Sequence, residues 1–155
     1  VLLGSVIALR NLDTLYSTYF TVSMVVAIWI CDSAAYIFGM KWGQKKIFPR
    51  VSPNKSWVGS IAGLVSTFIV FHGLRVQGIL PGLTLLDVAV FSIITGFFGQ
   101  VGDFAESLLK RDVGVKDSGK LLLGHGGVLD RFDSITFASP LTYAYITLIY
   151  YPRLF

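Results

Sequence analysis

Residues 102–134 read GDFAESLLKRDVGVKDSGKLLLGHGGVLDRFDS and form a polar island in an otherwise apolar chain. The island holds six of the nine acidic residues and five of the thirteen Lys and Arg residues. Charged groups beside a membrane are costly unless they are paired or hydrated, and they usually mark a functional site. The sequence therefore predicts that the chemistry is centred on this stretch and that the apolar segments around it are its scaffold.

The composition is that of a membrane protein. Of the 155 residues, 54% are hydrophobic and only 14% are charged, whereas a soluble domain carries about 25% charged residues. We therefore predict an all-α fold, a polytopic integral membrane helical bundle with a polar active site on its cytoplasmic side. Because the chain starts at Val1 within an apolar stretch, we expect residues 1–155 to be one membrane domain, the C-terminal part of a longer chain.

Four segments are predicted to span the membrane, which takes about 20 residues for a helix. They are 18–40, 58–72 with an extension to 80 left open, 83–108, and 133–151. The second segment contains Gly59 and Gly63. This spacing of small residues is typical of closely packed membrane helices. It fits packing inside the bundle and equally fits a homodimer.

The basic residues predict the orientation. Loop 41–57 carries five cations and no anion, and residues 103–131 carry five more. If the helices alternate in direction, both basic segments lie on one face, which the positive-inside rule assigns to the cytoplasm. Asp32, two-thirds along the first span, can converge on the same side of the membrane with the loop and the polar island.

The acidic residues of the island have helical spacing. If residues 100–111 form a helix, Asp103, Glu106 and Lys110 lie on one face. Asp130 and Asp133 are also three residues apart and open the last helix. Two helix ends that carry carboxylates could together hold Mg²⁺, which binds one or two carboxylates plus waters and phosphate oxygens. Zinc is not expected, because the one cysteine and two histidines lack ligand spacing.

A glycine-rich run, GHGG at 124–127, leads into the last helix. Glycine lets backbone amides approach an anion, and a helix N-terminus favours negative charge. Carboxylates that can bind a metal, a glycine-rich backbone and many cations are together typical of phosphoryl or nucleotidyl transfer. From the residues alone, a charged loop that neutralises itself by ion pairs remains the alternative.

Three sequence blocks resemble a known family. They are DSAAY at 32–36 with Gly39 and Gly43, SPNKSW at 52–57 with Gly59, and the long block of SLLKR (107–111), KDSG (116–119) and HGGVLDRFD (125–133). In this order they resemble the conserved blocks of the phosphatidate cytidylyltransferase (CDP-diacylglycerol synthase) family and cover about residues 32–134. Two residues depart from the family pattern: Leu123 replaces the usual Pro, and Val58 replaces a frequent acidic residue. Leu123 puts the loop geometry in doubt more than the activity.

The resemblance implies a reaction in phospholipid biosynthesis. CTP and phosphatidic acid would give CDP-diacylglycerol and pyrophosphate, with Mg²⁺ as cofactor and a second, monovalent or divalent, cation left open. The phosphatidate phosphate would attack the α-phosphorus of CTP. Such a phosphate is largely ionised near pH 7, so the site needs positioning and charge neutralisation more than a strong base.

The resemblance also suggests residue roles. The expected catalytic residues are Asp103, Lys110, Lys116, Asp117, His125, Asp130 and Arg131. The expected metal ligands are Asp103 and Asp130, with Glu106 and Asp133 close by. The expected substrate-binding residues are Asp32, Asn54, Lys55, Ser56, Ser107, Arg111, Gly126 and Gly127. Lysine and arginine would bind the phosphates, Asp32 would orient Lys55 or contact the metal, and His125 would donate to a phosphate unless its role is structural.

The expected partners are CTP, phosphatidic acid and membrane lipid, with no nucleic acid and with a homodimer left open. One alternative is a CTP-dependent lipid kinase, of the polyprenol type, which would transfer the γ-phosphoryl group instead. A second alternative is a transporter with Asp32 and the polar loop on its ion path. In that protein the charges should follow the transmembrane path, whereas here they cluster on one side.

Overall fold

A computed structural model of the chain describes residues 4–12, 17–80, 82–115 and 129–154, without the side chains of residues 129–131 and 154. Within these ranges the regular structure is helical, apart from one isolated β-bridge between Lys46 and Ser56. The predicted all-α class is thereby confirmed. The island residues 116–128 lie outside the described part of the chain.

The helices of the described residues fall into a first part, a middle column and a last column. The first part of the chain forms α1 (Gly4–Arg10), α2 (Ser17–Trp42) and α3 (Trp57–Val76). The middle forms a continuous column of α4 (Leu85–Ser92), the π-helix η1 (Ile93–Phe98) and α5 (Gly99–Asp112). The last column is α6 (Leu129–Tyr145), the π-helix η2 (Ile146–Tyr150) and α7 (Tyr151–Leu154). In the described residues, α3 ends at Val76 and so extends beyond the shorter of the two predicted ends.

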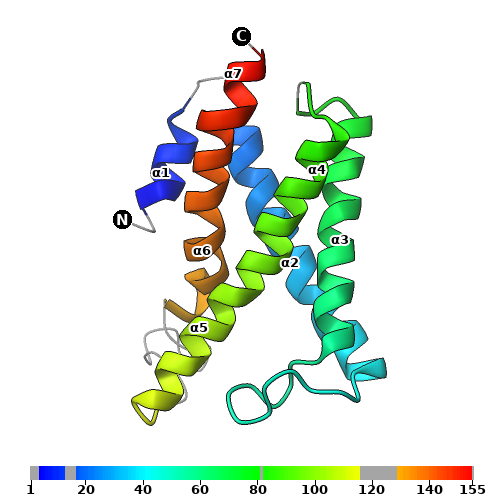
Figure 1. Ribbon diagram of the computed structural model, residues 1–155, viewed down its shortest axis with the longest axis vertical. Helices are drawn as coiled ribbons and strands as arrows, with labels where there is room; N and C mark the ends of the chain where they lie inside the picture. The colour runs from blue at the N-terminus through cyan, green and yellow to red at the C-terminus, as the bar shows by residue number, and fades with distance from the viewer. Residues whose placement is uncertain (1–3, 13–16, 81, 116–128, 155) are drawn as a thin grey trace.

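Within the described part of the chain, three helical stretches are long and apolar enough to cross a membrane: α2, α3 and the column Leu85–Asp112. The fourth predicted span, 133–151, falls within the last column, which contains Pro140. Figure 1 shows the middle column crossing the front of α2 diagonally, with α3 on one side and α6 on the other. The loop between α2 and α3 and the C-terminal end of α5 lie at the same end of the bundle (Figure 1).

An aromatic cluster fills the half of the bundle away from that loop. The ring of Phe91 on α4 is fully buried and lies 5.4 Å from the ring of Phe71 and 5.2 Å from that of Tyr145. Phe20 and Tyr150 complete the cluster, with ring centres 5.1 Å apart. Offset and edge-to-face pairs of this kind add to the stabilisation from burial, so the four longest segments are fixed to one another here.

Close backbone contact joins α2 and α3 at the other end. A Cβ atom on Gly59 would lie 2.6 Å from the carbonyl oxygen of Ala35, and one on Gly63 would lie 2.8 Å from Cys31 Sγ. No real side chain could fit at these distances without a shift of the helices. Both glycines therefore allow α3 to pack closely against α2 inside the bundle, which is one of the two roles predicted from their spacing.

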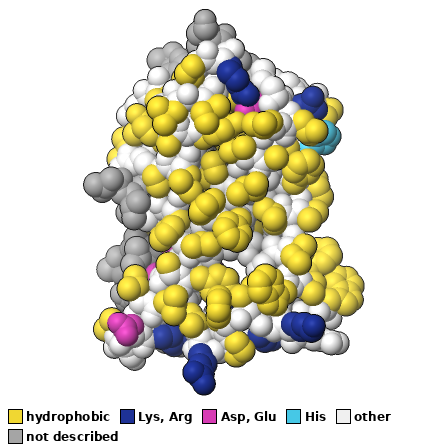
Figure 2. Space-filling model, in the orientation of Figure 1, with side chains coloured by type: hydrophobic (Ala, Val, Ile, Leu, Met, Phe, Trp, Pro, Cys, Tyr) yellow, Lys and Arg dark blue, Asp and Glu magenta, His cyan; other side chains and the backbone are white. Residues whose placement is uncertain are grey.

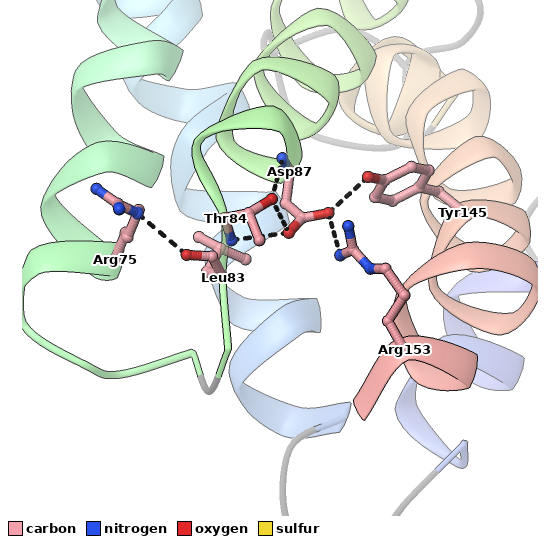
Figure 3. A network of polar contacts seen from close by, with 6 residues as sticks. All are labelled: Arg75, Leu83, Thr84, Asp87, Tyr145 and Arg153. Carbon is pink, nitrogen blue, oxygen red and sulfur yellow. Dashed lines mark hydrogen bonds and ion pairs between the residues drawn. The ribbon is translucent and has the colours of Figure 1, made fainter. Parts of the chain in front are cut away.

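A polar network closes the end of the bundle opposite the loop (Figure 3). The carboxylate of Asp87, in the first turn of α4, is fully buried. It accepts hydrogen bonds from Thr84, from the Tyr145 hydroxyl (2.6 Å) and from the Arg153 guanidinium (2.6 Å). The network thereby ties the start of the middle column to the end of the last one.

Candidate active site

A polar cavity of about 270 Å³ opens at the loop end of the bundle. It lies between α2, the loop before α3, the first turn of α3 and the start of α5. Its lining residues are Asp32, Ala35, Tyr36, Ser52, Asn54, Lys55, Ser56, Gly59, Ser60, Gln100 and Asp103. The cavity therefore joins the first two sequence blocks to the polar helix that begins the third.

Lys55 holds a central place in this cavity. Its ammonium forms an ion pair with the carboxylate of Asp103 and lies 4.2 Å from the centre of the Phe104 ring. Both side chains of the ion pair are only partly exposed, at 24% for Lys55 and 34% for Asp103. An ion pair that water reaches only in part is screened less than a surface pair, so each charge holds the other in position.

The loop that carries Lys55 is fixed at its end. The Ile47 amide donates to the Lys55 carbonyl, and the Trp57 amide donates to the Lys45 carbonyl, each at 3.1 Å. Ser56 is the N-cap of α3, and its hydroxyl accepts a hydrogen bond from the Gly59 amide at 3.2 Å. Capping is the usual role of serine at this position. The Ser56 hydroxyl thus positions the loop, although it also borders the cavity.

Carboxylates from three helices gather beside Lys55. Asp32 on α2 lies within electrostatic range of Asp103 on α5 and of Asp133 on α6. Glu106, one turn after Asp103, is buried, interacts with Asp133 and lies 3.7 Å from Lys110. The negative charges of these carboxylates repel one another, and nearby cations such as Lys55 offset that repulsion.

Gly102 explains how α5 and α6 bring their acids together. It is buried on α5, and a Cβ atom there would lie 2.7 Å from the carbonyl oxygen of Asp133 and 2.9 Å from a ring carbon of Phe137. Glycine lets the two backbones approach to within contact. Asp103 and Asp133 are therefore neighbours because the residue beside Asp103 has no side chain.

We expect Gly102→Ala to lower the free energy of unfolding by about 1–3 kcal/mol, the usual cost of overpacking, and to reduce any activity of the site. Gly73→Ala is the matched control, because a Cβ on that helical glycine meets only the end of Gln77, at 4.0 Å. The control should gain about 0.5–1 kcal/mol in helix stability. Denaturant or thermal unfolding in detergent measures both. Equal stability of the two variants would contradict the close contact.

The structure brings together much of the predicted site. Five predicted residues line the cavity: Asp32, Asn54, Lys55, Ser56 and Asp103. Glu106, Lys110 and Asp133 lie beside it. Arg111 instead reaches the loop, where its Nε donates to the Val51 carbonyl at 3.4 Å. Ser107 is half-buried on α5 and is not among the cavity's lining residues.

The remaining predicted residues fall outside what the structure describes. These are Lys116, Asp117, His125, Gly126 and Gly127, and also the side chains of Asp130 and Arg131, whose backbone forms the first turn of α6. Leu123, which departs from the family pattern, lies in the same undescribed segment.

Four polar residues that line the cavity were not predicted as site residues: Tyr36, Ser52, Ser60 and Gln100. The Gln100 amide donates to the Ser60 carbonyl at 3.1 Å and to Cys31 Sγ at 3.5 Å. It thereby joins α5 to both α2 and α3. The available signal was an amide in an apolar span, three residues before Asp103 and so on nearly the same helix face.

The acidic residues suit a divalent cation of the Mg²⁺ type. Carboxylate oxygens are the ligands that such an ion prefers, and the gathered charges of Asp32, Asp103 and Asp133 need positive charge close to them. Among the side chains that the structure describes, no group of three or more Asp, Glu, His or Cys residues has the geometry of a metal site. Asp130, an expected ligand, lies beyond those side chains.

Comparison with known proteins assigns the chain to a family. Residues 4–149 match the model of the cytidylyltransferase family. The chain belongs to that family. The phosphatidate cytidylyltransferase of Bacillus subtilis is 41% identical over 142 residues, which are 92% of this chain and 52% of the relative. That of Staphylococcus aureus is 46% identical over 121 residues, 74% of this chain and 44% of the relative.

A relative with lower identity has the same name. The phosphatidate cytidylyltransferase of Haemophilus influenzae is 37% identical over 131 residues, 83% of this chain and 46% of the relative. The chain thus spans about half the length of the curated relatives it matches. Membership of this family and the three long apolar helices identify an integral membrane protein.

Proposed function

We propose that the protein containing this chain transfers CMP from CTP to phosphatidic acid, giving CDP-diacylglycerol and pyrophosphate. The observation that carries the proposal is the cavity in which Asp32 of the first sequence block, Lys55 of the second block and Asp103 meet. Asp103 lies on α5, the helix on which the third block begins. Relatives that share 37–46% identity with the chain are named as enzymes of this reaction. Their names support the proposal, and the cavity supplies its chemistry.

In the proposed reaction, an oxygen of the phosphatidate phosphate attacks the α-phosphorus of CTP. A new P–O bond forms, the bond from the α-phosphorus to the oxygen that bridges it to the β-phosphorus breaks, and pyrophosphate leaves with that oxygen. The attacking phosphate is largely ionised near pH 7, because its second pKa is about 6. The protein therefore has to align two anions and offset their repulsion, and it needs no strong base.

The residues of the cavity suit these two tasks. Lys55 offers a positive charge that the loop and the Phe104 ring hold in place. Lys110 lies one turn further along the same helix as Glu106, and Arg111 links that helix to the loop. We propose that Lys55 and Lys110 bind phosphate oxygens and that Asp32 orients Lys55.

Mg²⁺ is part of the proposal. Asp103, Asp130 and Asp133 would hold it, with Glu106 next to Asp133, and a second cation fits the same acidic group. A bound Mg²⁺ neutralises phosphate charge and makes the α-phosphorus more reactive. Lys55 pairs with Asp103 in the structure, so that Asp103 already lies beside a positive charge.

We also propose that the cavity faces the cytoplasm. The loop between α2 and α3 carries Lys45, Lys46, Arg50 and Lys55, and Lys110 and Arg111 end α5 at the same end of the bundle. An excess of Lys and Arg is typical of the cytoplasmic side. CTP would enter from that side, while phosphatidic acid would reach the cavity from the membrane.

We expect Lys55→Met to reduce CMP transfer by about 10²-fold, the usual effect of removing one group that stabilises a transition-state charge. Lys46→Met is the matched control, since Lys46 is exposed on the same loop and its side chain does not line the cavity. The control should keep its rate within about threefold, because isolated surface charges contribute little. Initial rates at saturating CTP measure both, and similar losses in the two variants would contradict the role of Lys55.

The experiment that tests the proposed function follows two labels. The purified full-length protein is incubated with Mg²⁺, with either phosphatidic acid or a polyprenol, and with CTP labelled on either the α- or the γ-phosphate. Transfer of the α-label into lipid with release of pyrophosphate is the expected result. Transfer of the γ-label into a lipid alcohol, with CDP left behind, would replace the proposal by a lipid kinase. Unchanged CTP would overturn both.

A further inference from the structure

A second, apolar groove adjoins the polar cavity and has no role in the reaction described so far. It has a volume of about 380 Å³ and lies between the loop, α3, η1 and the first turns of α5. Its lining residues are Ile47, Phe48, Trp57, Ser60, Ile61, Leu64, Gly96, Phe97, Gln100, Val101 and Phe104. Figure 2 shows a hollow framed by apolar side chains, just above the basic edge of the molecule.

The groove is open to the outside of the bundle. The side chains of Phe48, Trp57 and Phe97 are each more than half exposed, and so is Ile61. The volume lies in the range of small-molecule sites, about 300–1,000 Å³. Apart from Ile47 and Phe48 of the loop, its lining residues belong to α3 and the middle column, which are long enough to cross a membrane. An apolar ligand could therefore enter from the lipid without passing through water.

The groove and the polar cavity meet at two residues and one ring. Ser60 and Gln100 line both spaces. The ring of Phe104 lies under the Lys55 ammonium, with its centre 4.2 Å away, and packs edge-on against Phe48 with ring centres 5.8 Å apart. Phe104 thus contacts both the cation of the polar cavity and an apolar residue of the groove.

We infer that this groove holds one acyl chain of phosphatidic acid while the phosphate of the same molecule lies at Lys55. The inference rests on the proposed function and adds a second site to it, the one that selects the acyl chain. A lipid with an anionic head and an apolar tail matches this arrangement, because its head would lie at the Lys55 cation and its tail in the adjoining apolar groove. CTP does not match the groove, because its sugar and triphosphate would lose water without gaining hydrogen bonds there.

The geometry also indicates which residues set the shape of the groove. η1 is a π-helix, and such turns are frequent at functional sites. It brings Gly96 against α3, where a Cβ would lie 2.6 Å from Thr67 Oγ1, and leaves Phe97 at the groove wall. Phe97 and Val101, one turn apart, are therefore the residues whose size should decide which chains fit.

Val101→Trp tests the inference, because a large ring there fills the groove. Rates are measured in the same detergent with dihexanoyl and with dioleoyl phosphatidic acid. We expect kcat/KM for the dioleoyl lipid to fall at least about tenfold, the effect of a few misplaced methylenes in an apolar pocket. The dihexanoyl lipid, whose chains are too short to fill the groove, should change by less than about threefold, and the KM for CTP should not change.

Val65→Trp is the matched control, since Val65 lies on α3 but lines a different apolar groove, between α2 and α3. It should leave the ratio of the two lipid rates unchanged. Phe97→Ala is a second variant that spares the core, because Phe97 is 53% exposed. It should raise the KM for the dioleoyl lipid and leave that for CTP unchanged, and it decides the matter if Val101→Trp does not fold.

The failures are distinguishable. Equal loss with both lipids in Val101→Trp, or no change in KM for either lipid in Phe97→Ala, would overturn the acyl-chain site while the transfer reaction stands. If the unmodified protein transfers CMP to neither lipid, the proposed function itself is wrong. A photoreactive acyl chain supplies a readout without turnover, and its cross-link should fall within 57–64 or 96–104.

Discussion

Asp103→Asn should reduce CMP transfer by about 10³-fold while leaving the protein folded. Asparagine has nearly the same shape as aspartate, so the packing of α5 should survive. The lost charge matters in two ways. Lys55 loses the carboxylate with which it pairs, and Mg²⁺ would lose one of its proposed anionic ligands. Removal of one electrostatic group from an active site commonly costs 10²–10³-fold in rate, and here one change disturbs two.

The control for Asp103→Asn is Asp112→Asn. Asp112 is the last residue of the same helix and is exposed. Its variant carries the same change of charge on α5 but should retain nearly full activity, because exposed charges are well screened. Initial rates and a Mg²⁺ titration measure both variants. Activity of Asp103→Asn above about a tenth of the unmodified rate, with an unchanged Mg²⁺ midpoint, would overturn the proposed role of Asp103.

The sequence predicted the helices well because the apolar segments are long and the breaks between them are strong. The break between α2 and α3 is marked by two prolines, Pro49 and Pro53, and by the cations of the loop. Helical spacing also predicted which residues of α5 share a face: Glu106 and Lys110 do pair, at 3.7 Å. Periodicity and charge are local properties, and a single sequence shows them directly.

Contacts between helices were harder to predict. The closeness of Asp133 to Asp103 depends on Gly102, and nothing in the spacing of these residues states which helix Gly102 faces. Gln100 looked like an isolated polar residue, yet it joins three helices. Gly59 and Gly63 predicted close packing, but the choice between an internal contact and a homodimer needed the position of α2. Which helix such a residue contacts depends on the tertiary arrangement, which the spacing of residues in one sequence does not show.

The network at the far end of the bundle was also not predicted, although its signal was present. Thr84 and Asp87 stand three residues apart before an apolar run, which is the pattern of a capping box, and the structure contains that box. The pattern explains the hydrogen bonds between Asp87 and Thr84. Two more come from Tyr145 and Arg153, 58 and 66 residues later, and no local rule connects those positions.

Asp87→Asn should lower the free energy of unfolding by about 1–3 kcal/mol, the cost of leaving a buried polar group without its hydrogen-bond partner. All the partners of Asp87 donate. Thr84 donates its amide and hydroxyl to Oδ2, while Tyr145 and Arg153 donate to Oδ1. An asparagine would place its NH₂ group against either the Thr84 amide or the Arg153 guanidinium, neither of which can accept. Unfolding in detergent measures the loss.

Two tyrosine variants calibrate that loss. Tyr145→Phe removes one donor from Asp87 and should cost about 1 kcal/mol, whereas Tyr143→Phe, a half-buried neighbour, should cost less. A loss in Asp87→Asn no larger than that in Tyr145→Phe would contradict the donor mismatch. Because the network and the cavity lie at opposite ends of the bundle, Asp87→Asn should retain normal turnover at temperatures where it is folded. Asp103→Asn should show the reverse, normal stability without turnover. The two variants would thus show that Asp87 acts in stability and Asp103 in the reaction.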